Sequence, residues 1–270
     1  MQLFNSHVHT STSPDCTAPI EDICLAAFGA GFSGIAITDH CSGSHYISYN
    51  SYDILKNSLR DVRRLAKEYQ GKMEVLAGVE FEEIIWSPEY INRLIATSRF
   101  DVVLASVHKV QNVPDTRYFS RIDFSTYTND ELSYYINCYF KDVLKTVKTC
   151  DFDVLSHLTI ILRYVCGKYK IDFNLSEFMP IIDEILAVLI ERDKALEINT
   201  SEFSTVGLMP DEKILSMYRT LGGRKITIGT DAHFPQDISK GFDFAIDVLR
   251  KIGFDSYYYY KNRLPQKIII

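Results

Sequence analysis

The chain has 270 residues, of which 46% are hydrophobic and 24% charged, a balance typical of a folded globular protein. Its net charge of −6 and the lack of any run of lysines or arginines disfavour nucleic acid as a partner and favour a small ligand. No apolar stretch approaches the roughly 20 residues that span a bilayer, and there is neither a secretory segment nor a Cys-x-x-Cys pair, so we expect a cytoplasmic protein that enters no membrane.

Short β-branched runs alternate with longer amphipathic stretches along the chain. This pattern predicts seven strands, at residues 2–6, 34–38, 74–80, 101–107, 152–156, 195–199 and 225–229. Helical patterns fill the gaps, and the clearest lie at residues 52–70, 129–149, 175–193 and 210–222. Two further short strands are predicted within residues 255–262 and 267–270, and their pairing is left open.

The predicted strands are continuous apolar runs, which indicates that both faces of a parallel sheet are covered by helices. Seven strand–helix units of this kind predict an α/β fold in which the sheet closes, or nearly closes, into a barrel similar to a TIM barrel. Such barrels form one domain of about 250 residues. The sequence therefore predicts a single domain over residues 1–270.

Six of the seven histidines, all except His45, come where a predicted strand gives way to its helix. The motifs at these strand ends are HVH at 7–9, TDH at 38–40, GVE at 78–80, SVH at 106–108, SH at 156–157 and GTDAH at 229–233. In barrels of this type the C-terminal ends of the strands form the active site. One such histidine alone is typical of a turn, but turn histidines have no reason to collect at one rim.

The HVH motif favours a metal site. His7 and His9 are two residues apart, so both imidazoles leave the first strand on the same side. Imidazole and carboxylate ligands together suit zinc, iron and manganese, and this many ligands predict a site for more than one ion. Glu80, on a middle strand, is the expected bridging carboxylate. Glu82 points to the same side by alternation, whereas Glu83 points the other way and is expected to be a solvated loop charge.

These motifs, in this order and with the pair Ser13-x-Asp15 after the first, resemble those of the polymerase and histidinol phosphatase (PHP) family over nearly the whole chain. The length, the EINTS segment at 197–201 and the stand-alone organisation are most similar to the family's histidinol-phosphate phosphatases of histidine biosynthesis. The resemblance implies a distorted (β/α)7 barrel that holds three divalent metal ions, which are zinc, manganese or iron.

The resemblance also implies which residues bind each ion. One ion would be held by His7, His9, Glu80 and Asp231, a second by Glu80, His108 and His157, and a third by Asp15, His40 and His233. Some relatives have a histidine where this chain has Asp15. That difference exchanges a nitrogen ligand for an oxygen ligand at the third site.

The reaction implied by the family is hydrolysis of a phosphate monoester, here L-histidinol phosphate, to the alcohol and phosphate. A hydroxide that bridges the first two ions attacks phosphorus in line, and no phosphoenzyme is required. Arg163 and Arg117 are the arginines expected on the phosphate, because a planar guanidinium matches two oxygens at once. Asp231 or His233 is the candidate general acid for the leaving alkoxide.

Two further substrate-binding candidates follow the sixth predicted strand on the same rim. They are Asn199 and Glu202, and Glu202 is expected to meet the amine of the substrate. A cationic amine also suits an acidic chain.

Three alternatives remain open: an amidohydrolase-like barrel, a PHP nuclease or nucleotide phosphatase, and a non-catalytic PHP module that binds metal for stability. Amidohydrolases usually hold a carbamylated lysine on the fourth strand, where this chain has His108 followed by Lys109. An intact ligand set in a stand-alone chain favours catalysis over the third alternative. The sequence leaves the oligomeric state open.

Overall fold

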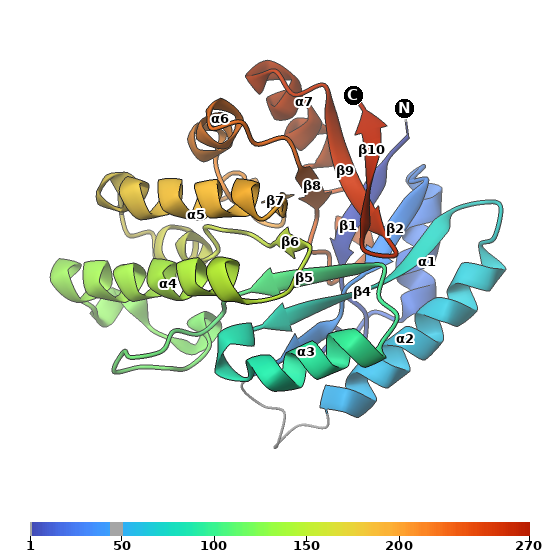
Figure 1. Cartoon of the computed structure of the whole chain (residues 1–270), viewed down its shortest axis with the longest axis horizontal. Helices are drawn as coiled ribbons and strands as arrows, with labels where there is room; N and C mark the ends of the chain where they lie inside the picture. Colours follow the sequence, from blue (N-terminus) through green and yellow to red (C-terminus); the bar gives the residue numbers. More distant parts are fainter. Residues whose placement is uncertain (1, 44–50) are drawn as a thin grey trace.

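The computed structural model describes residues 2–43 and 51–270, so His45 lies outside the described residues. Strands and helices alternate in seven successive units (Figure 1). In chain order they are β1 (Phe4–Val8), α1 (Ile20–Gly29), β2 (Gly34–Ile37), β3 (His40–Ser42), α2 (Ser51–Glu68), β4 (Glu74–Glu82), α3 (Pro88–Thr97), β5 (Val102–Ser106), α4 (Asn129–Thr149), β6 (Val154–Leu155), α5 (Met179–Glu191), β7 (Ala195–Asn199), α6 (Glu212–Thr220), β8 (Ile226–Gly229) and α7 (Phe242–Ile252). A hairpin follows, made of β9 (Ser256–Lys261) and β10 (Leu264–Ile269).

The strands of the seven units form one parallel sheet in the order β1-β2-β4-β5-β6-β7-β8, and β3 continues beside the C-terminal half of β4. Beyond β8 the sheet returns to β1. There the amide of Asp231 donates to the carbonyl of His7 at 2.9 Å, and the amide of His9 donates to the carbonyl of Ala232 at 3.0 Å. These bonds nearly close the sheet at the C-terminal ends of its strands, and the result is the predicted distorted (β/α)7 barrel.

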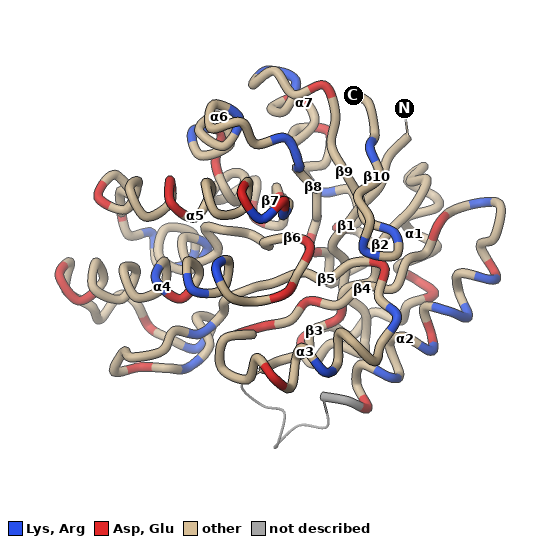
Figure 2. Tube along the Cα trace, viewed as in Figure 1, with Lys and Arg blue, Asp and Glu red and all other residues tan. Residues whose placement is uncertain are grey.

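The apolar residues of the strands are buried on both sides of the sheet, which agrees with their continuous apolar runs. Ile35, Val79, Val103 and Ile228 are fully buried. Lysines and arginines gather instead on the outer helices, most densely along α2 (Figure 2). None of the helices in the described ranges is long and apolar enough to cross a membrane.

Two helix boundaries show how local sequence sets the elements. α4 begins as predicted because Thr128 and Glu131 form a reciprocal capping box: the Thr128 side chain accepts from the Glu131 amide, and the Glu131 carboxylate accepts from the Thr128 amide. α5 begins at Met179, four residues later than predicted, because Pro180 is tolerated only in the first turn of a helix. A short 3₁₀ turn occupies Leu175–Phe178.

Two strands continue further into the polar motifs than predicted. β1 includes His7, and β4 continues to Glu82. These side chains extend the strands because partners inside the barrel satisfy them, as described below. β6 is shorter than predicted, since its chain turns at His157, whose φ of 24° lies outside the β region.

The two predicted C-terminal strands pair with each other. β9 and β10 are antiparallel, and the two residues between them, Asn262 and Arg263, both have positive φ, as a tight hairpin turn of this type requires. The hairpin lies against β1: the Tyr257 hydroxyl accepts from the amide of Phe4 at 2.8 Å, and the Tyr259 ring stacks on the Phe4 ring.

Arg263 fixes the hairpin turn to the N-terminal end of the barrel. Its guanidinium donates to Asp151 at 2.8 and 2.9 Å and to Asp153 at 3.0 and 3.1 Å, just before β6. Asp153 is buried and also accepts from the amide of Val103 at 2.9 Å. Burial raises the pKa of Asp153 despite Arg263, whereas Arg263 lowers the pKa of the more exposed Asp151.

We predict that Arg263→Ala lowers the free energy of unfolding at neutral pH by about 1.5–3 kcal/mol, because the buried Asp153 carboxylate loses its counter-charge. Without Arg263 the pKa of Asp153 in the folded protein rises further above its unfolded value, and the depressed pKa of Asp151 returns toward its ordinary value. Because of both changes, the difference in free energy of unfolding between wild type and variant is largest at neutral pH. It becomes smaller as the pH falls through the acidic range. Urea unfolding midpoints measured between pH 4 and 7.5 would check this.

The control for this prediction is Lys251→Ala, which removes an exposed pair with Glu212. Such a pair is worth at most about 1 kcal/mol. The prediction would be contradicted if Arg263→Ala lost no more free energy of unfolding than the control, or if its loss did not change with pH.

Candidate metal centre

Six histidines converge at the C-terminal ends of the barrel strands. They come from β1, β3 and the segments that follow β1, β5, β6 and β8, and they are His7, His9, His40, His108, His157 and His233. Three carboxylates that were predicted with them, Asp15, Glu80 and Asp231, lie among their rings. The structure thus brings together all nine residues predicted as metal ligands.

Glu80 lies at the centre of this cluster and is fully buried. Its two oxygens face different histidines. Oε2 lies 3.3 Å from Nε2 of His7 and 3.4 Å from Nε2 of His9, whereas Oε1 lies 2.8 Å from Nε2 of His157 and 3.8 Å from Nε2 of His108. One carboxylate therefore belongs to two groups of ring nitrogens, which is the arrangement of a bridging ligand.

The first group centres on two ring nitrogens. Nε2 of His7 and Nε2 of His9 are 3.0 Å apart, and Oε2 of Glu80 lies 3.3 and 3.4 Å from them. Ligands about 2.0–2.1 Å from a tetrahedral zinc ion lie about 3.3 Å from one another. The atoms of His7, His9 and Glu80 have the spacing of ligands around one ion. Oδ1 of Asp231 lies on the same two nitrogens, 3.6 Å from Nε2 of His7 and 3.0 Å from Nε2 of His9.

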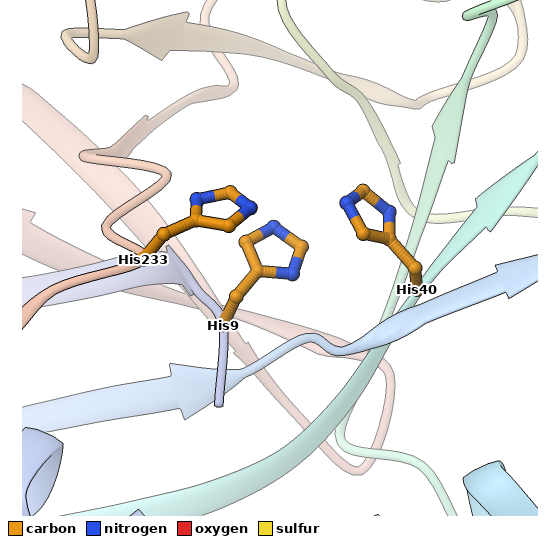
Figure 3. A group of neighbouring side chains, drawn as sticks. All are labelled: His9, His40 and His233. Atoms are coloured by element: carbon orange, nitrogen blue, oxygen red, sulfur yellow. The ribbon is translucent and has the colours of Figure 1, made fainter. Parts of the chain in front are cut away.

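The third predicted group lies nearer the surface. Oδ2 of Asp15 is 3.4 Å from Nε2 of His40 and 3.3 Å from Nε2 of His233. Figure 3 shows the ring of His9 between those of His40 and His233, and its centroid is 4.3 Å from each of them. His40 also reaches the centre, where its Nδ1 lies 2.9 Å from Oε2 of Glu80. The three groups are therefore contiguous.

Two buried carboxylates accept hydrogen bonds from Nδ1 of two histidines, on the side of each ring away from the cluster. Nδ1 of His7 donates to Oε1 of Glu197 at 2.7 Å, and Nδ1 of His108 donates to Oε1 of Glu82 at 2.8 Å. A proton on Nδ1 leaves the lone pair on Nε2, the nitrogen that faces the cluster. This is the outer-sphere arrangement of metal-bound histidines.

A hydroxyl group and a backbone carbonyl accept hydrogen bonds from Nδ1 of two more rings. The Ser13 hydroxyl donates to Asp39 at 3.0 Å, so it accepts from Nδ1 of His9 at 3.1 Å. Nδ1 of His233 donates to the carbonyl of Asp231 at 2.9 Å. Four of the six rings thus have Nδ1 held by an acceptor and Nε2 turned to the cluster, an orientation that fits these residues to divalent metal ions.

The charges in the cluster stabilise one another. Burial alone would raise the pKa of Glu80, but His40 and His7 hold it well below its ordinary value. Burial, together with the neighbouring His40 and His233, lowers the pKa of His9 to about 3. Although burial opposes it, the neighbouring carboxylates raise the pKa of His7 and His40 well above the ordinary value, so a metal ion that binds these rings would displace protons.

Glu83 is not the solvated loop charge that alternation predicted. Its backbone turns at a φ of 47°, and its buried Oε1 accepts from the amides of His108 at 2.7 Å and Lys109 at 3.1 Å. Burial and the neighbouring Glu82 raise the pKa of Glu83 to about 7. Glu83 therefore anchors the segment that carries His108.

The cluster opens into a cavity of about 300 Å³, a size that suits a small molecule. Five of the predicted ligands line the cavity, together with aromatic, aliphatic and polar side chains that include Ser42, Ile54, Glu82, Tyr118, Phe119, Arg121, Ile160, Arg163 and Tyr164. The site thus combines charged groups at the cluster with flat apolar walls.

Of the two predicted arginines, one lies at the cavity and the other does not. Arg163, the first residue of a π-helical turn (Arg163–Lys168), lines the cavity. Of the arginines that the structure describes, Arg121 lines it too, but Arg117 does not: its side chain is exposed and pairs with Asp115. Arg117 and Arg121 belong to the same irregular segment, in which no periodicity shows which side chains turn inward.

The other two substrate-binding predictions are corrected. Asn199 is fully buried, and its side chain donates to Glu197 at 3.2 Å and accepts from the amide and hydroxyl of Ser201. Glu202 lies 3.3 Å from Nε of Arg163, and it is outside the cavity lining in the described part of the chain. Asn199 therefore supports the β7 end and is not open to a substrate, and Glu202 pairs with Arg163 beside the cavity.

The prediction from sequence missed the supporting residues Glu197 and Asp39, and it turned Glu82 toward the site without giving it a role. Glu197 had a usable signal, because it is a charged residue in the middle of an otherwise apolar strand. Asp39 lies inside the TDH motif, where its carboxylate accepts from Thr10, Ser13 and Ser58. Each of these residues acts across strands, so sequence spacing does not assign its partner.

Comparison with known proteins agrees with this geometry. The sequence profile of the PHP domain matches residues 5–201. A probable histidinol-phosphatase from Clostridium acetobutylicum is 29% identical, over 96% of this chain and 98% of that protein, and a histidinol-phosphatase from Lactococcus lactis is 27% identical, over 94% and 93%. The crystal structure of the Lactococcus lactis histidinol phosphate phosphatase, complexed with zinc, L-histidinol and phosphate, matches with a TM-score of 0.81 at 25% identity, over 98% of this chain and 99% of that one.

We predict that Glu80→Gln loses the ions of the first two groups together, because a carboxamide keeps the volume of the side chain but removes its charge and one acceptor oxygen. Elemental analysis of the purified variant should find at least one ion fewer per chain than in wild type, with an unchanged circular dichroism spectrum. Glu74→Gln, at the other end of β4 and paired with Lys261, is the matched control. Full metal content in Glu80→Gln would refute the bridging assignment.

Proposed function

Because the chain belongs to the PHP domain family, we propose that it is a histidinol-phosphatase, which hydrolyses L-histidinol phosphate to L-histidinol and phosphate in histidine biosynthesis. The observation that carries the proposal is the likeness, over 98% of this chain, to the enzyme whose structure holds zinc, L-histidinol and phosphate. The relatives from Clostridium acetobutylicum and Lactococcus lactis match more than nine-tenths of the chain. Matches over this much of the chain support a single domain over residues 1–270.

Three divalent ions, which are zinc, manganese or iron, fit the three groups of ligands. The first group is His7, His9, Glu80 and Asp231, the second is Glu80, His108 and His157, and the third is Asp15, His40 and His233. When bound, such ions would make water a stronger nucleophile and neutralise phosphate oxygens. The support for this assignment is the close spacing of His7, His9 and Glu80 and the outer partners that hold Nδ1 of four rings, which turns their Nε2 atoms to the cluster.

Arg163 is the residue that we assign to the phosphate. Its guanidinium lies at the cavity, where Glu202 holds Nε at 3.3 Å and Oδ2 of Asp231 lies 3.8 Å from Nη1. A planar guanidinium held in this way presents two donors to two phosphate oxygens. Arg121, on the same cavity, takes the supporting role that Arg117 was expected to have.

Asp231 is the residue that we assign to proton transfer. Its Oδ1 faces Nε2 of His9 at 3.0 Å, whereas Oδ2 is turned toward Arg163 and the cavity. Oδ2 would take a proton from the attacking water and deliver it to the leaving oxygen of the alcohol. His233 is a poorer candidate, since its Nδ1 donates to a backbone carbonyl and its Nε2 faces Asp15.

The walls of the cavity support a substrate with a flat ring. Tyr118, Phe119 and Tyr164 line it, and aromatic faces of this kind can pack against an imidazole. The volume of about 300 Å³ suits histidinol phosphate better than an oligonucleotide.

A phosphate-release panel on the metal-loaded enzyme tests the substrate. We expect kcat/KM for L-histidinol phosphate to exceed that for AMP and p-nitrophenyl phosphate by at least about tenfold, since one charged hydrogen bond to the amine or ring is worth roughly 1.5–3 kcal/mol. A preference for AMP would indicate a nucleotide phosphatase, and cleavage of short oligonucleotides would indicate a nuclease. No release from any substrate at full metal content would indicate a non-catalytic module.

We predict that Arg163→Ala raises KM about 10–100-fold for every phosphate ester that the enzyme accepts, because the lost contact is to the shared phosphate and not to the leaving alcohol. Steady-state kinetics on two esters with different alcohols would measure it. Arg117→Ala is the matched control, since its side chain is exposed and pairs with Asp115, and its KM should stay at the wild-type value. A rise for one ester alone would make Arg163 a specificity residue.

A further inference from the structure

Glu197 lies beneath the metal centre, in the middle of the penultimate barrel strand, and is fully buried. Its two oxygens serve different partners. Oε1 accepts from Nδ1 of His7 at 2.7 Å, and Oε2 accepts from the backbone amide of His157 at 2.8 Å. Asn199, two residues along the same strand, donates to Oε2 at 3.2 Å and fixes the carboxylate from the side.

The partners of Glu197 belong to different ligand groups. His7 is in the first group and His157 in the second, and Glu80 connects the same two groups from the other side. The backbone of His157 has a φ of 24°, which a residue with a β-carbon rarely adopts. The hydrogen bond from its amide to Glu197 holds the backbone in that conformation.

The neighbouring strand leaves room for this carboxylate. Gly229, at the end of β8, lies where any β-carbon would overlap Oε1 of Glu197 and the β-carbon of His7. The absence of a side chain at Gly229 therefore allows the close approach of Glu197 to His7.

We propose that Glu197 is a positioning residue that couples the first two metal groups: it keeps His7 in the tautomer that can bind metal, and it holds the backbone of His157 so that its ring reaches Glu80. The inference rests on the proposed metal sites. The carboxylate of Glu197 contacts Nδ1 of His7 and the backbone of His157, and not the ring nitrogens that face Glu80. It therefore acts through these two histidines and not as a ligand.

The isosteric variant Glu197→Gln tests whether both carboxylate oxygens are needed as hydrogen-bond acceptors. A carboxamide has one acceptor oxygen, whereas the site needs two, one for Nδ1–H of His7 and one for the amide of His157. The backbone amide cannot change its role, so the oxygen turns to His157 and the NH₂ group faces Nδ1 of His7. His7 must then carry its proton on Nε2, where it blocks metal binding.

The experiment measures zinc affinity by competition with a chromophoric chelator, and imidazole ¹⁵N shifts of the metal-free protein at a pH where the His7 ring is neutral. We expect Glu197→Gln to bind zinc about 10–100-fold more weakly than wild type, and its metal-free His7 ring to carry the proton on Nε2 in place of Nδ1. Glu184→Gln, an exposed residue on α5 paired with Lys148, is the matched control and should match wild type in both measurements. Gly229→Ala keeps the charge of Glu197 but displaces its carboxylate, so it should also weaken zinc binding.

Three results would overturn the inference. The first is wild-type zinc affinity in Glu197→Gln. The second is an unchanged His7 tautomer. The third is a large loss of stability in the metal-free variant while its folded fraction binds zinc as tightly as wild type, which would make Glu197 a purely structural residue. If the wild-type protein itself bound no divalent metal, the proposed function would fall, and this inference with it.

Discussion

The burial of the Glu80 carboxylate is the constraint on which the rest of the site depends. An ionised carboxylate without solvent is costly unless charges and hydrogen bonds compensate it. In this protein five imidazoles from four segments of the chain supply that compensation, and three of them are held in turn by a second partner. Glu80 is therefore at the centre of a set of polar groups. Glu82, Glu197 and Ser13 form its outer part, where they accept hydrogen bonds from the histidines that surround Glu80. Only a barrel, whose strand ends all meet at one rim, can bring so many separate segments to one carboxylate.

The two ends of the barrel use charge differently. At the C-terminal end of the strands the charged groups form the metal centre and the cavity. At the other end Arg263 joins the hairpin to the segment before β6 through two aspartates. The first arrangement lies at the cavity, whereas the second holds the terminal hairpin against β1. Function and stability are thus placed on opposite faces, as is usual for this architecture.

Much of the fold can be predicted from the sequence, because each unit carries its own signal in a run of β-branched residues followed by a helical period. The candidate metal ligands can be picked out because their residue types are unusual at strand ends, and the structure brings all nine of them together. The outer partners are different. Whether Glu197 meets His7 depends on the order of strands around the barrel, which local pattern does not give. Arg121 and Arg117 differ only in which way an irregular segment turns, and the burial of Glu83 depends on a single backbone angle of 47°. Contacts of this kind follow from tertiary structure alone.

The closure of the barrel between β8 and β1 has a consequence for biosynthesis of the protein. The residues that close it, His7 and His9 on one side and Asp231 and Ala232 on the other, come from opposite ends of the chain. The ribosome therefore releases the first histidines long before Asp231 exists, and contacts so distant in sequence form late in folding. A nascent chain can offer only incomplete, weakly binding fragments of the first ligand group. The first ligand group is therefore complete, and able to bind metal as proposed, only after translation has passed the last barrel strand.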